Sequence, residues 1–412
     1  GYFMGARKEY FESYQAHHQQ TIDLKYDFPQ HKRPFPVPEP MWPEREKKTN
    51  DRRHFDVVIV SDFRLLGGST LSSAEEIKAQ LRGGLKTGLI QLNRYDYDAN
   101  RKINKKIRDL VDGDKVQFVV YGEKISCDVL IIRYPPVLQE KQRFVPDVEA
   151  RDVRIIVNQT PYSHYGEGGE IRFDILRCQQ RVRELFGKEG VWHPIGPLVR
   201  NALLQYHADE LSSIHLSDQD WHNIINIDEW RRKERPQKSS VIKIGRHSRG
   251  DAVKWPSNKD VLLSVYPDSS EFEIRVLGGA DVPRKILGKL PSNWRVYAFN
   301  ELDPKEFLAD LDVFVYFTHE HWVESFGRVI LEAMAAGVPV ILSPHYRQQF
   351  GDAAIYAEPS QVVQEIRALM SNEEYYQQKV TLAQQYVERE FGYGKHLSRI
   401  EAIRGGMKIA EN

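Results

Sequence analysis

Two series of short apolar runs, each alternating with helical patterns, constrain the fold of this 412-residue chain more than any other feature. The first series opens at residues 55–61 and the second at residues 241–244. Strand-length apolar runs separated by amphipathic helical patterns predict parallel sheets with helices on both faces. We therefore expect an α/β fold with two Rossmann-like, doubly wound units of about 160 residues each, which face each other across a cleft.

The rest of each series fits the same interpretation. Further strands of the first unit are expected at 88–92, 117–121, 129–133 and 153–157, with helical patterns at 103–111 and 171–186. Those of the second unit are expected at 273–277, 295–299, 313–317 and 338–342. A helix is expected after the loop at 67–70, because Ser72 or Ser73 precedes Glu75 or Glu76 by three residues, as in a capping box. The polar stretch 230–238 marks the boundary, which gives domains at 55–238 and 239–393.

Residues 1–54 differ from the remainder of the chain. Six prolines between positions 29 and 43 favour an extended, polyproline-like conformation. One interpretation is a flexible linker from an upstream module. We favour a proline-rich N-terminal extension that contacts the body of the protein or a partner.

Charge and cysteine content exclude several classes of protein. Lys plus Arg and Asp plus Glu both number 58, which argues against general nucleic-acid binding. Cys127 and Cys178 have no metal-ligand spacing and fit a reducing cytoplasm. No apolar run approaches the roughly 18 residues of a membrane span.

Residues 323–341 combine a loop, a short helix, a glycine stop and a buried strand. Glu324 falls at the junction between loop and helix, and Glu332 lies within the apolar helix. A carboxylate in such a run is costly to bury unless it is hydrogen-bonded. Eight helical residues span about 12 Å, roughly the length of an extended nucleotide-sugar. Amide groups around Ser325, Phe326 and Gly327 would point at an anion such as a phosphate.

Cations follow the first strand of the second unit. Gly245 is expected to form a turn there, and Arg246, Arg249 and Lys254 cluster after it, which suits a diphosphate. A surface run of charge is the alternative. In the first unit, Gly67 and Gly68 are expected to open a backbone turn onto the cleft, or else to form a plain strand-to-helix turn. Neither segment has the spacing of a P-loop or a dinucleotide fingerprint.

Other candidates lie at strand ends and in one loop. Gly278, Tyr297 and Phe299 end two strands of the second unit, where backbone groups can pair with a base edge; a core strand with an aromatic residue at its end is the alternative. His164 follows a buried strand of the first unit and is a candidate for contacting substrate or moving a proton, with His193 as a second candidate, and a histidine of a surface loop is the alternative. Asp310 and Asp312 resemble a metal-binding pair, but one solvated and one capping residue is the interpretation we prefer, so no metal is expected.

The stretch Glu324-Ser325-Phe326-Gly327-x4-Glu332 with its trailing Gly-x-Pro-Val resembles the Glu-x7-Glu signature of retaining GT-B glycosyltransferases of glycosyltransferase family four. Gly245-Arg246 with Lys254 resembles the family's diphosphate-binding segment, and Gly67-Gly68 its N-terminal glycine loop. The family usually has Lys-Gly where this chain has Lys254-Trp255.

The resemblance implies roles for these residues. Glu332 would accept hydrogen bonds from the ribose hydroxyls, and Glu324 would accept them from hydroxyls of the donor sugar. The backbone amides of residues 325–327 would donate hydrogen bonds to the sugar or the phosphates. Arg246 and Lys254 would neutralise the leaving diphosphate, and no metal would be required. A C-terminal helix within 394–412 would cross back to the first domain.

The function implied is transfer of a sugar from a nucleotide-diphosphate sugar to a glycan or lipid-linked acceptor, with retention of anomeric configuration. UDP is the expected nucleotide, with GDP and dTDP as alternatives. We expect a cytoplasmic enzyme of polysaccharide or glycolipid synthesis, with peripheral association at the inner face of the membrane left open and with no nucleic-acid partner. The alternatives are a nucleotide-sugar epimerase or hydrolase on the same fold, and a non-catalytic glycan- or nucleotide-binding partner in a larger assembly.

Overall fold

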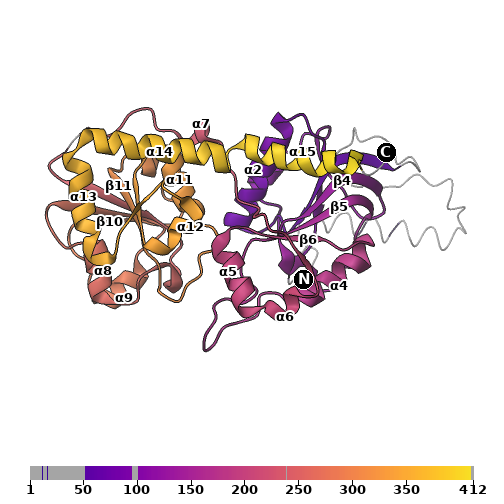
Figure 1. Cartoon of the computed structure of the whole chain (residues 1–412), viewed down its shortest axis with the longest axis horizontal. Coiled ribbons are helices and arrows are strands. Elements are labelled where there is room, and N and C mark those ends of the chain that lie inside the picture. Colours follow the sequence, from indigo (N-terminus) through magenta and orange to yellow (C-terminus); the bar gives the residue numbers. More distant parts are fainter. Residues whose placement is uncertain (1–11, 13–15, 17–51, 95–100, 238, 410–412) are drawn as a thin grey trace, which may run out of the picture. The chain divides into compact units, whose positions relative to one another are not determined.

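A parallel seven-stranded sheet forms the first part of the described chain (Figure 1). The computed structural model describes residues 12, 16, 52–94, 101–237 and 239–409, so the proline-rich stretch lies outside the described residues. The strand order is β3-β2-β1-β4-β5-β6-β7. The strands are β1 (Arg53–Ser61), β2 (Thr87–Gln91), β3 (Val116–Phe118), β4 (Lys124–Ile132), β5 (Asp147–Val157), β6 (Val191–Pro194) and β7 (His215–Leu216).

A second parallel sheet has six strands in the order β10-β9-β8-β11-β12-β13. These are β8 (Ile242–His247), β9 (Phe272–Leu277), β10 (Trp294–Tyr297), β11 (Val313–Tyr316), β12 (Val340–Leu342) and β13 (Ile355–Tyr356). The two expected α/β units are therefore present. Three strands that the apolar runs did not indicate, namely β6, β7 and β13, complete the sheets.

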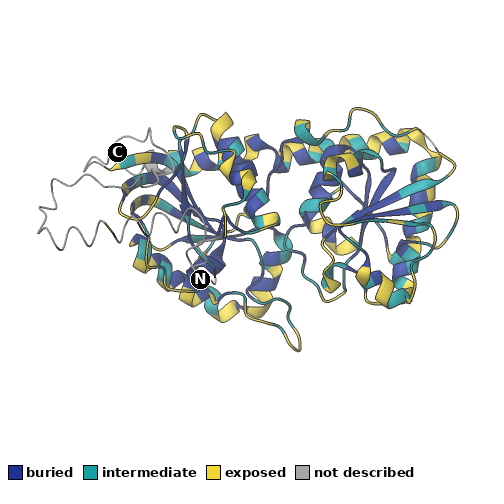
Figure 2. Cartoon of the chain, turned by 180° about the vertical axis from the view of Figure 1, so that it is seen from behind, coloured by how far each residue is buried: buried dark blue, intermediate teal, exposed yellow. Residues whose placement is uncertain are grey.

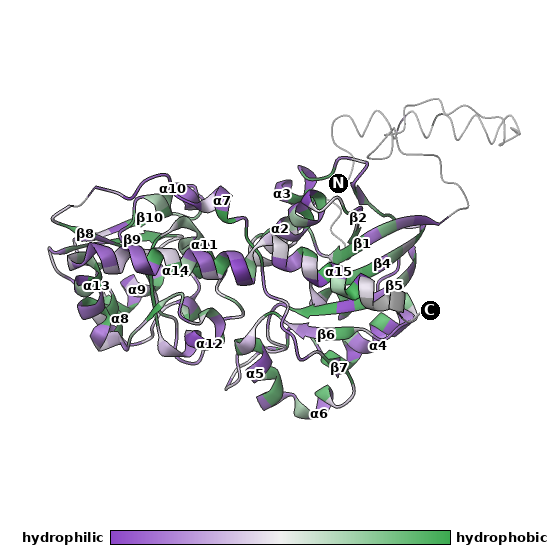
Figure 3. Cartoon of the chain, turned by 45° about the horizontal axis from the view of Figure 1, so that its top comes forward, coloured by the Kyte–Doolittle hydropathy of each residue, from purple (hydrophilic) through white to green (hydrophobic). Residues whose placement is uncertain are grey.

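Helices cover these sheets, as an all-parallel arrangement requires. In the first part they are α2 (Gly68–Arg82), α3 (Lys105–Arg108), α4 (Ile175–Phe186), α5 (Pro197–Tyr206), α6 (Ala208–Leu211) and α7 (Ile227–Trp230). In the second they are α8 (Lys259–Val265), α9 (Asp281–Leu287), α10 (Pro304–Ala309), α11 (Arg328–Ala336), α12 (Arg347–Phe350), α13 (Val362–Ser371) and α14 (Glu373–Phe391). Figure 2 shows that the strands are mostly buried, and Figure 3 shows their apolar character.

The predicted capping box in α2 is wrong. The helix begins at Gly68, with Gly67 as its N-cap residue at φ 117°, and no side chain caps it. Ser72 and Ser73 lie one turn inside the helix, and their hydroxyls donate to the carbonyls of Gly68 and Ser69. This back-bonding satisfies buried serines within a helix, so the hydroxyls are not available as caps.

The last helix, α15 (Tyr393–Ile409), contacts the first sheet and α2 after α14 has packed against α11 (Figure 1). Tyr393 donates its hydroxyl to Glu75 at 2.7 Å. Arg404 bridges two strands through Asp56 and Asp128, at 2.6 and 2.8 Å. These partly buried ion pairs tie the C-terminal helix to β1 and β4. Among the described residues, no helix is both long enough and apolar enough to cross a bilayer.

Candidate active site

The carboxyl ends of the second sheet place the site residues next to one another. Because β8 to β12 are all parallel, the segments after His247, Leu277, Tyr297 and Tyr316 emerge at one edge. Such an edge is where ligands bind in open α/β sheets. Helix α11 begins at this edge, and Gly327 is its N-cap in the left-handed region at φ 80°. No side chain caps this helix, so its first amides keep their capacity to bind an anion.

Glu324 lies at the centre of a buried polar cluster. Lys254 Nζ donates to Glu324 Oε2 at 2.6 Å, and the Tyr316 hydroxyl donates to the same oxygen at 2.9 Å. Burial acts to raise the pKa of Glu324, but the charge and hydrogen bond of Lys254, together with the Tyr316 hydroxyl, outweigh it and hold the pKa below its usual value. Glu324 is therefore ionised and already paired with a cation. The Lys254 ammonium also lies 5.0 Å from the centre of the Trp322 ring.

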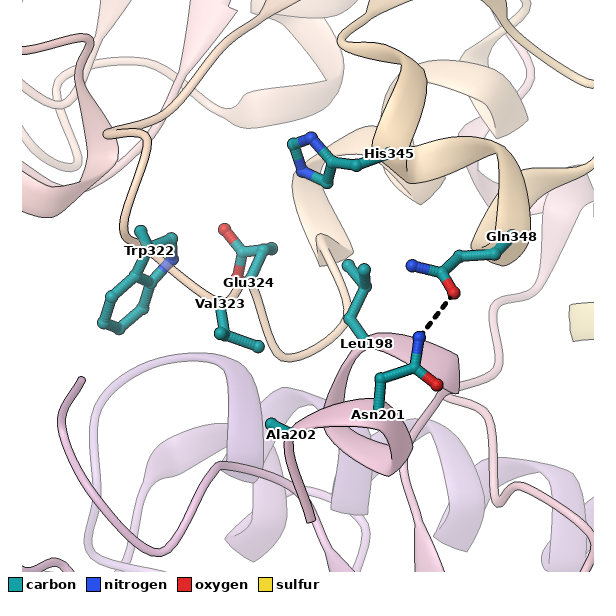
Figure 4. Close-up of a pocket in the computed structure, with 8 residues that line it drawn as sticks. All are labelled: Leu198, Asn201, Ala202, Trp322, Val323, Glu324, His345 and Gln348. Atoms are coloured by element: carbon teal, nitrogen blue, oxygen red, sulfur yellow. Dashed lines mark hydrogen bonds between the residues drawn. The ribbon is translucent and has the colours of Figure 1, made fainter. Parts of the chain in front are cut away.

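A cavity of about 190 Å³ opens beside Glu324 (Figure 4). The loop before α11 contributes Trp322, Val323 and Glu324 to its lining, and α5 contributes Leu198, Asn201 and Ala202. His345 and Gln348 complete it, and Asn201 donates to Gln348 at 2.8 Å across the cavity edge. The lining combines an acid, an imidazole and two carboxamides with an indole, which are groups that can bind a polyhydroxylated ligand.

Glu332 forms a second acidic position on α11. It is 4% exposed, its Oε1 lies 3.0 Å from Arg328 Nε, and its Oε2 lies 4.0 Å from His247 Nδ1. Burial raises the pKa of Glu332 above its usual value in spite of Arg328. Burial, with the charge of Arg246, lowers the pKa of His247 to about 4, so that imidazole is neutral at physiological pH.

Arg246 lies elsewhere than expected, because the predicted turn at Gly245 is wrong. Strand β8 continues through His247, and residues two apart in a strand share a face. Arg246 therefore follows Ile244 into the interior, and Gly245 packs so closely on Leu311 that an added Cβ would lie 1.9 Å from that side chain.

The guanidinium of Arg246 is fully buried and held by its neighbours. It donates to the Tyr266 hydroxyl at 2.8 Å, to the Phe317 carbonyl at 2.9 Å and to the Lys254 carbonyl. It also stacks on Trp255, with 4.0 Å from the guanidinium carbon to the ring centre. The side chain thus anchors the Lys254 segment to the end of β11 and presents no exposed group at the edge of the sheet.

The remaining second-unit candidates lie at the ends of β9 and β10. Gly278 has φ 109°, and a Cβ there would meet the Ser248 carbonyl at 2.0 Å, so the close approach of these two loops requires glycine. The Tyr297 carbonyl accepts from Gly278 and Gly279, and Phe299 is 55% exposed just beyond the strand. Gly278 and Tyr297 are therefore neighbours, and Phe299 lies two residues beyond Tyr297 with about half of its surface exposed.

First-unit candidates are more scattered. Gly67 and Gly68 begin α2 at the carboxyl end of β1, and the adjacent Ser69 accepts from Asn158 at the end of β5. His164 is bound within its own loop, to Ser163 Oγ and the Glu167 carbonyl, and does not line the cavity. Neither segment contacts the Glu324 cluster.

His193 and the Asp310 pair are occupied by structural contacts. His193 is buried, with Nδ1 at 2.9 Å from the Gln219 carbonyl and Nε2 at 3.2 Å from Arg154. Asp310 pairs with Lys243 and Arg275, and Asp312 accepts from the Lys243 amide at 2.9 Å. In the part of the chain that the structure describes, no group of three or more acidic, histidine or cysteine residues could hold a metal ion.

Several residues of this site were missed from the sequence. Tyr316 looked like a core residue of a strand, and the loop around His345 carried no recognisable motif. Arg328 was detectable, because it lies four residues before Glu332 in the predicted helix and side chains four apart meet on a helix.

Two parallel sheets covered by helices, with a site at the carboxyl edge of the second sheet, are typical of the two-Rossmann GT-B fold. Residues 240–372 match the family model described as "Glycosyl transferases group 1". The match lies within the second unit, which is therefore similar to this family. No curated protein sequence gives a match.

Solved structures share the fold over most of the chain. HepE of Anabaena, in complex with UDP-glucose, is 12% identical with a TM-score of 0.57 and covers 86% of this chain and 100% of HepE. A glycosyltransferase of Rickettsia africae ESF-5 is 13% identical with a TM-score of 0.56, over 86% of this chain and 98% of that protein. An alpha-glucosyltransferase in complex with UDP and a DNA 13-mer is 10% identical with a TM-score of 0.51, over 85% and 100%. At these identities the likeness concerns the fold.

Proposed function

We propose that the protein transfers a sugar from a UDP-sugar to a hydroxyl group of a glycan or lipid-linked acceptor, with retention of anomeric configuration. The observation that carries this proposal is the buried Lys254–Glu324 pair, at 2.6 Å, beside both the uncapped start of α11 and the cavity. A carboxylate, a cation and free helix amides are the groups needed for sugar hydroxyls and a diphosphate. UDP is the first nucleotide to test, since HepE binds UDP-glucose on the same fold.

In this proposal the donor lies along α11 with its sugar in the cavity. Glu324 accepts hydrogen bonds from sugar hydroxyls, and the backbone amides of Ser325, Phe326 and Gly327 donate hydrogen bonds to the sugar or the phosphates. Glu332, further along α11, accepts hydrogen bonds from the ribose hydroxyls. The base lies toward Gly278, Tyr297 and Phe299, whose strand ends flank His247.

Lys254 changes partner when the donor binds. In the described structure its ammonium neutralises Glu324, and in the complex it turns toward the diphosphate, whose charge grows as the glycosidic bond breaks. The bond between the anomeric carbon and the phosphate oxygen breaks, and the acceptor oxygen bonds to the same carbon from the same face. The acceptor proton passes to the departing phosphate oxygen. No enzymatic nucleophile is needed in this scheme.

Arg246 is assigned a positioning role in place of the diphosphate contact that the resemblance implied. Its guanidinium fixes the Lys254 carbonyl and the Phe317 carbonyl, so it determines where the Lys254 segment lies. Leaving this position would require breaking those bonds and moving off the Trp255 ring.

The test is a thermal-shift screen with UDP-, GDP- and dTDP-sugars, followed by measurement of UDP release. A ligand at about 100 times its Kd stabilises the native state by about 2.7 kcal/mol, which gives a clear rise in melting temperature. The proposal expects a UDP-sugar to raise the melting temperature and to be hydrolysed slowly without acceptor. Binding without any release of UDP would indicate a non-catalytic binding partner, and no response to any nucleotide-sugar would refute the proposal.

A further inference from the structure

A cation at the start of α11 lies beside the second acidic position of the site and, in the sequence, between the two. Arg328 follows Glu324 by four residues and precedes Glu332 by four. Because Arg328 and Glu332 both lie on α11, this spacing makes them neighbours, and Arg328 Nε lies 3.0 Å from Glu332 Oε1. The arginine is also the first residue of α11, at the end that carries the positive pole of the helix dipole.

The guanidinium of Arg328 has capacity to bind a ligand. Its side chain is 11% exposed, its Nε faces Glu332, and its Nη1 makes no hydrogen bond within the part of the chain that the structure describes. Nε is therefore engaged with Glu332, and Nη1 is left as an unused donor. A buried guanidinium with unused donors is costly unless a ligand or solvent meets them.

The other cations of the segment are already engaged. Arg246 is fully buried and bound to two carbonyls and a hydroxyl. Arg249 is an exposed side chain paired with Asp251 at 3.3 Å. Lys254 supplies one positive charge, whereas a diphosphate carries at least two negative charges and favours bidentate donors.

We infer that Arg328 binds the diphosphate of the donor, in the role that the sequence resemblance implied for Arg246. This inference rests on the proposed function, because it assumes a nucleoside diphosphate along α11. Ribose hydroxyls engage Glu332, and the planar donors of Arg328 turn to the phosphate oxygens beside it. Arg328 and Lys254 then flank the diphosphate from the helix and from the segment after β8.

The competing explanation is that Arg328 only neutralises Glu332. The two explanations differ in which part of the nucleotide is affected. A diphosphate ligand role affects UDP and leaves uridine unchanged, whereas a supporting role for Glu332 weakens both, because both contain the ribose.

The experiment measures UDP and uridine affinity by calorimetry for wild type, Arg328→Gln, Arg328→Lys and Arg367→Gln. Arg367 is an exposed arginine paired with Glu271 and serves as the matched control. We expect Arg328→Gln to weaken UDP binding about 10- to 100-fold, as for a lost charged hydrogen bond, while uridine affinity stays within about twofold. Arg328→Lys keeps the charge without the planar fork and should lose less UDP affinity than Arg328→Gln.

The outcomes separate the two proposals. Wild type that binds neither UDP nor uridine refutes the proposed function and this inference with it. If wild type binds UDP, the role of Arg328 alone is refuted by either of two results for Arg328→Gln. One is an unchanged affinity for UDP, and the other is an equal loss of affinity for UDP and for uridine. If Arg328→Gln does not fold, Arg328→Lys decides the question, because UDP affinity equal to wild type would then contradict bidentate binding.

Discussion

Replacing Lys254 with methionine tests whether the ion pair with Glu324 is as tightly coupled as its geometry indicates. The two side chains are 12% and 9% exposed, and their charged atoms lie 2.6 Å apart. Removing one partner of a buried pair typically costs about 3–5 kcal/mol, because the other charge is left without compensation. Tyr316 still donates to Glu324 in the variant, so we expect the lower end, about 3 kcal/mol, at about pH 8.

The loss should depend on pH with a definite sign. In wild type the pKa of Glu324 lies below its usual value, so its contribution to stability is fully present above the unfolded-state pKa and is lost only in acid. Without Lys254, burial dominates and the folded-state pKa of Glu324 rises above the unfolded one. The protonated carboxyl is then tolerated at low pH, and stability falls as pH rises through the new pKa. The difference between variant and wild type is therefore small at about pH 5 and large at about pH 8.

Differential scanning calorimetry at these two pH values checks the prediction. A loss of about 3 kcal/mol in a domain of this size lowers the melting temperature by about 6–12 °C. Lys259→Met, the same change at an exposed position at the start of α8, should stay within about 0.5 kcal/mol of wild type. The double variant Lys254→Met with Glu324→Gln should recover much of the loss. Equal losses at both pH values, with no recovery in the double variant, would show that the pair is not coupled as described.

Other predictions concern the ligand and the backbone. Glu332→Ala should weaken UDP and uridine binding alike by about 1.5–3 kcal/mol in calorimetry, and unchanged affinity would contradict its ribose role. Glu324→Ala should lower turnover more than UDP affinity, whereas equal effects would place this residue away from the sugar. Gly327→Ala should lower the melting temperature more than Gly288→Ala, because both have φ near 80° but only the Gly327 Cβ would meet Ile330, at 2.7 Å. Chelation with EDTA should leave turnover intact, and loss of activity restored by manganese would contradict the metal-free scheme.

Much of the fold was predictable because buried parallel strands read as apolar runs. The run at 313–317 corresponds to β11, and the run at 273–277 corresponds to β9, each within one residue. The missed strands lack that signal. Strand β6 has four residues and ends in proline, and β7 and β13 have two residues each.

The site was predictable where a pattern fixed the residue and not where side-chain direction mattered. Glu324 and Glu332 were found because carboxylates in an apolar stretch are unusual. Arg246 was found, but its direction depended on whether β8 stops at Gly245 or continues to His247. Side chains alternate along a strand, so a continuation by two residues turns Arg246 to the side of Ile244. That continuation is set by pairing with β9, up to the contact of His247 with Leu277, which no local pattern reveals.

The return of α15 to the first sheet has a consequence for how the chain is made. The helix surface that carries Glu75 and Gln80 is completed by Tyr393 and His396, which are synthesised more than 300 residues later. At about 5–20 residues per second, ribosomal synthesis of the intervening chain takes roughly 15–60 s. The first sheet is complete once β7 has been synthesised, at Leu216, but one of its covering helices does not yet exist at that point. The nascent chain therefore leaves this face of α2 without its partner side chains until the C-terminal helix has been synthesised.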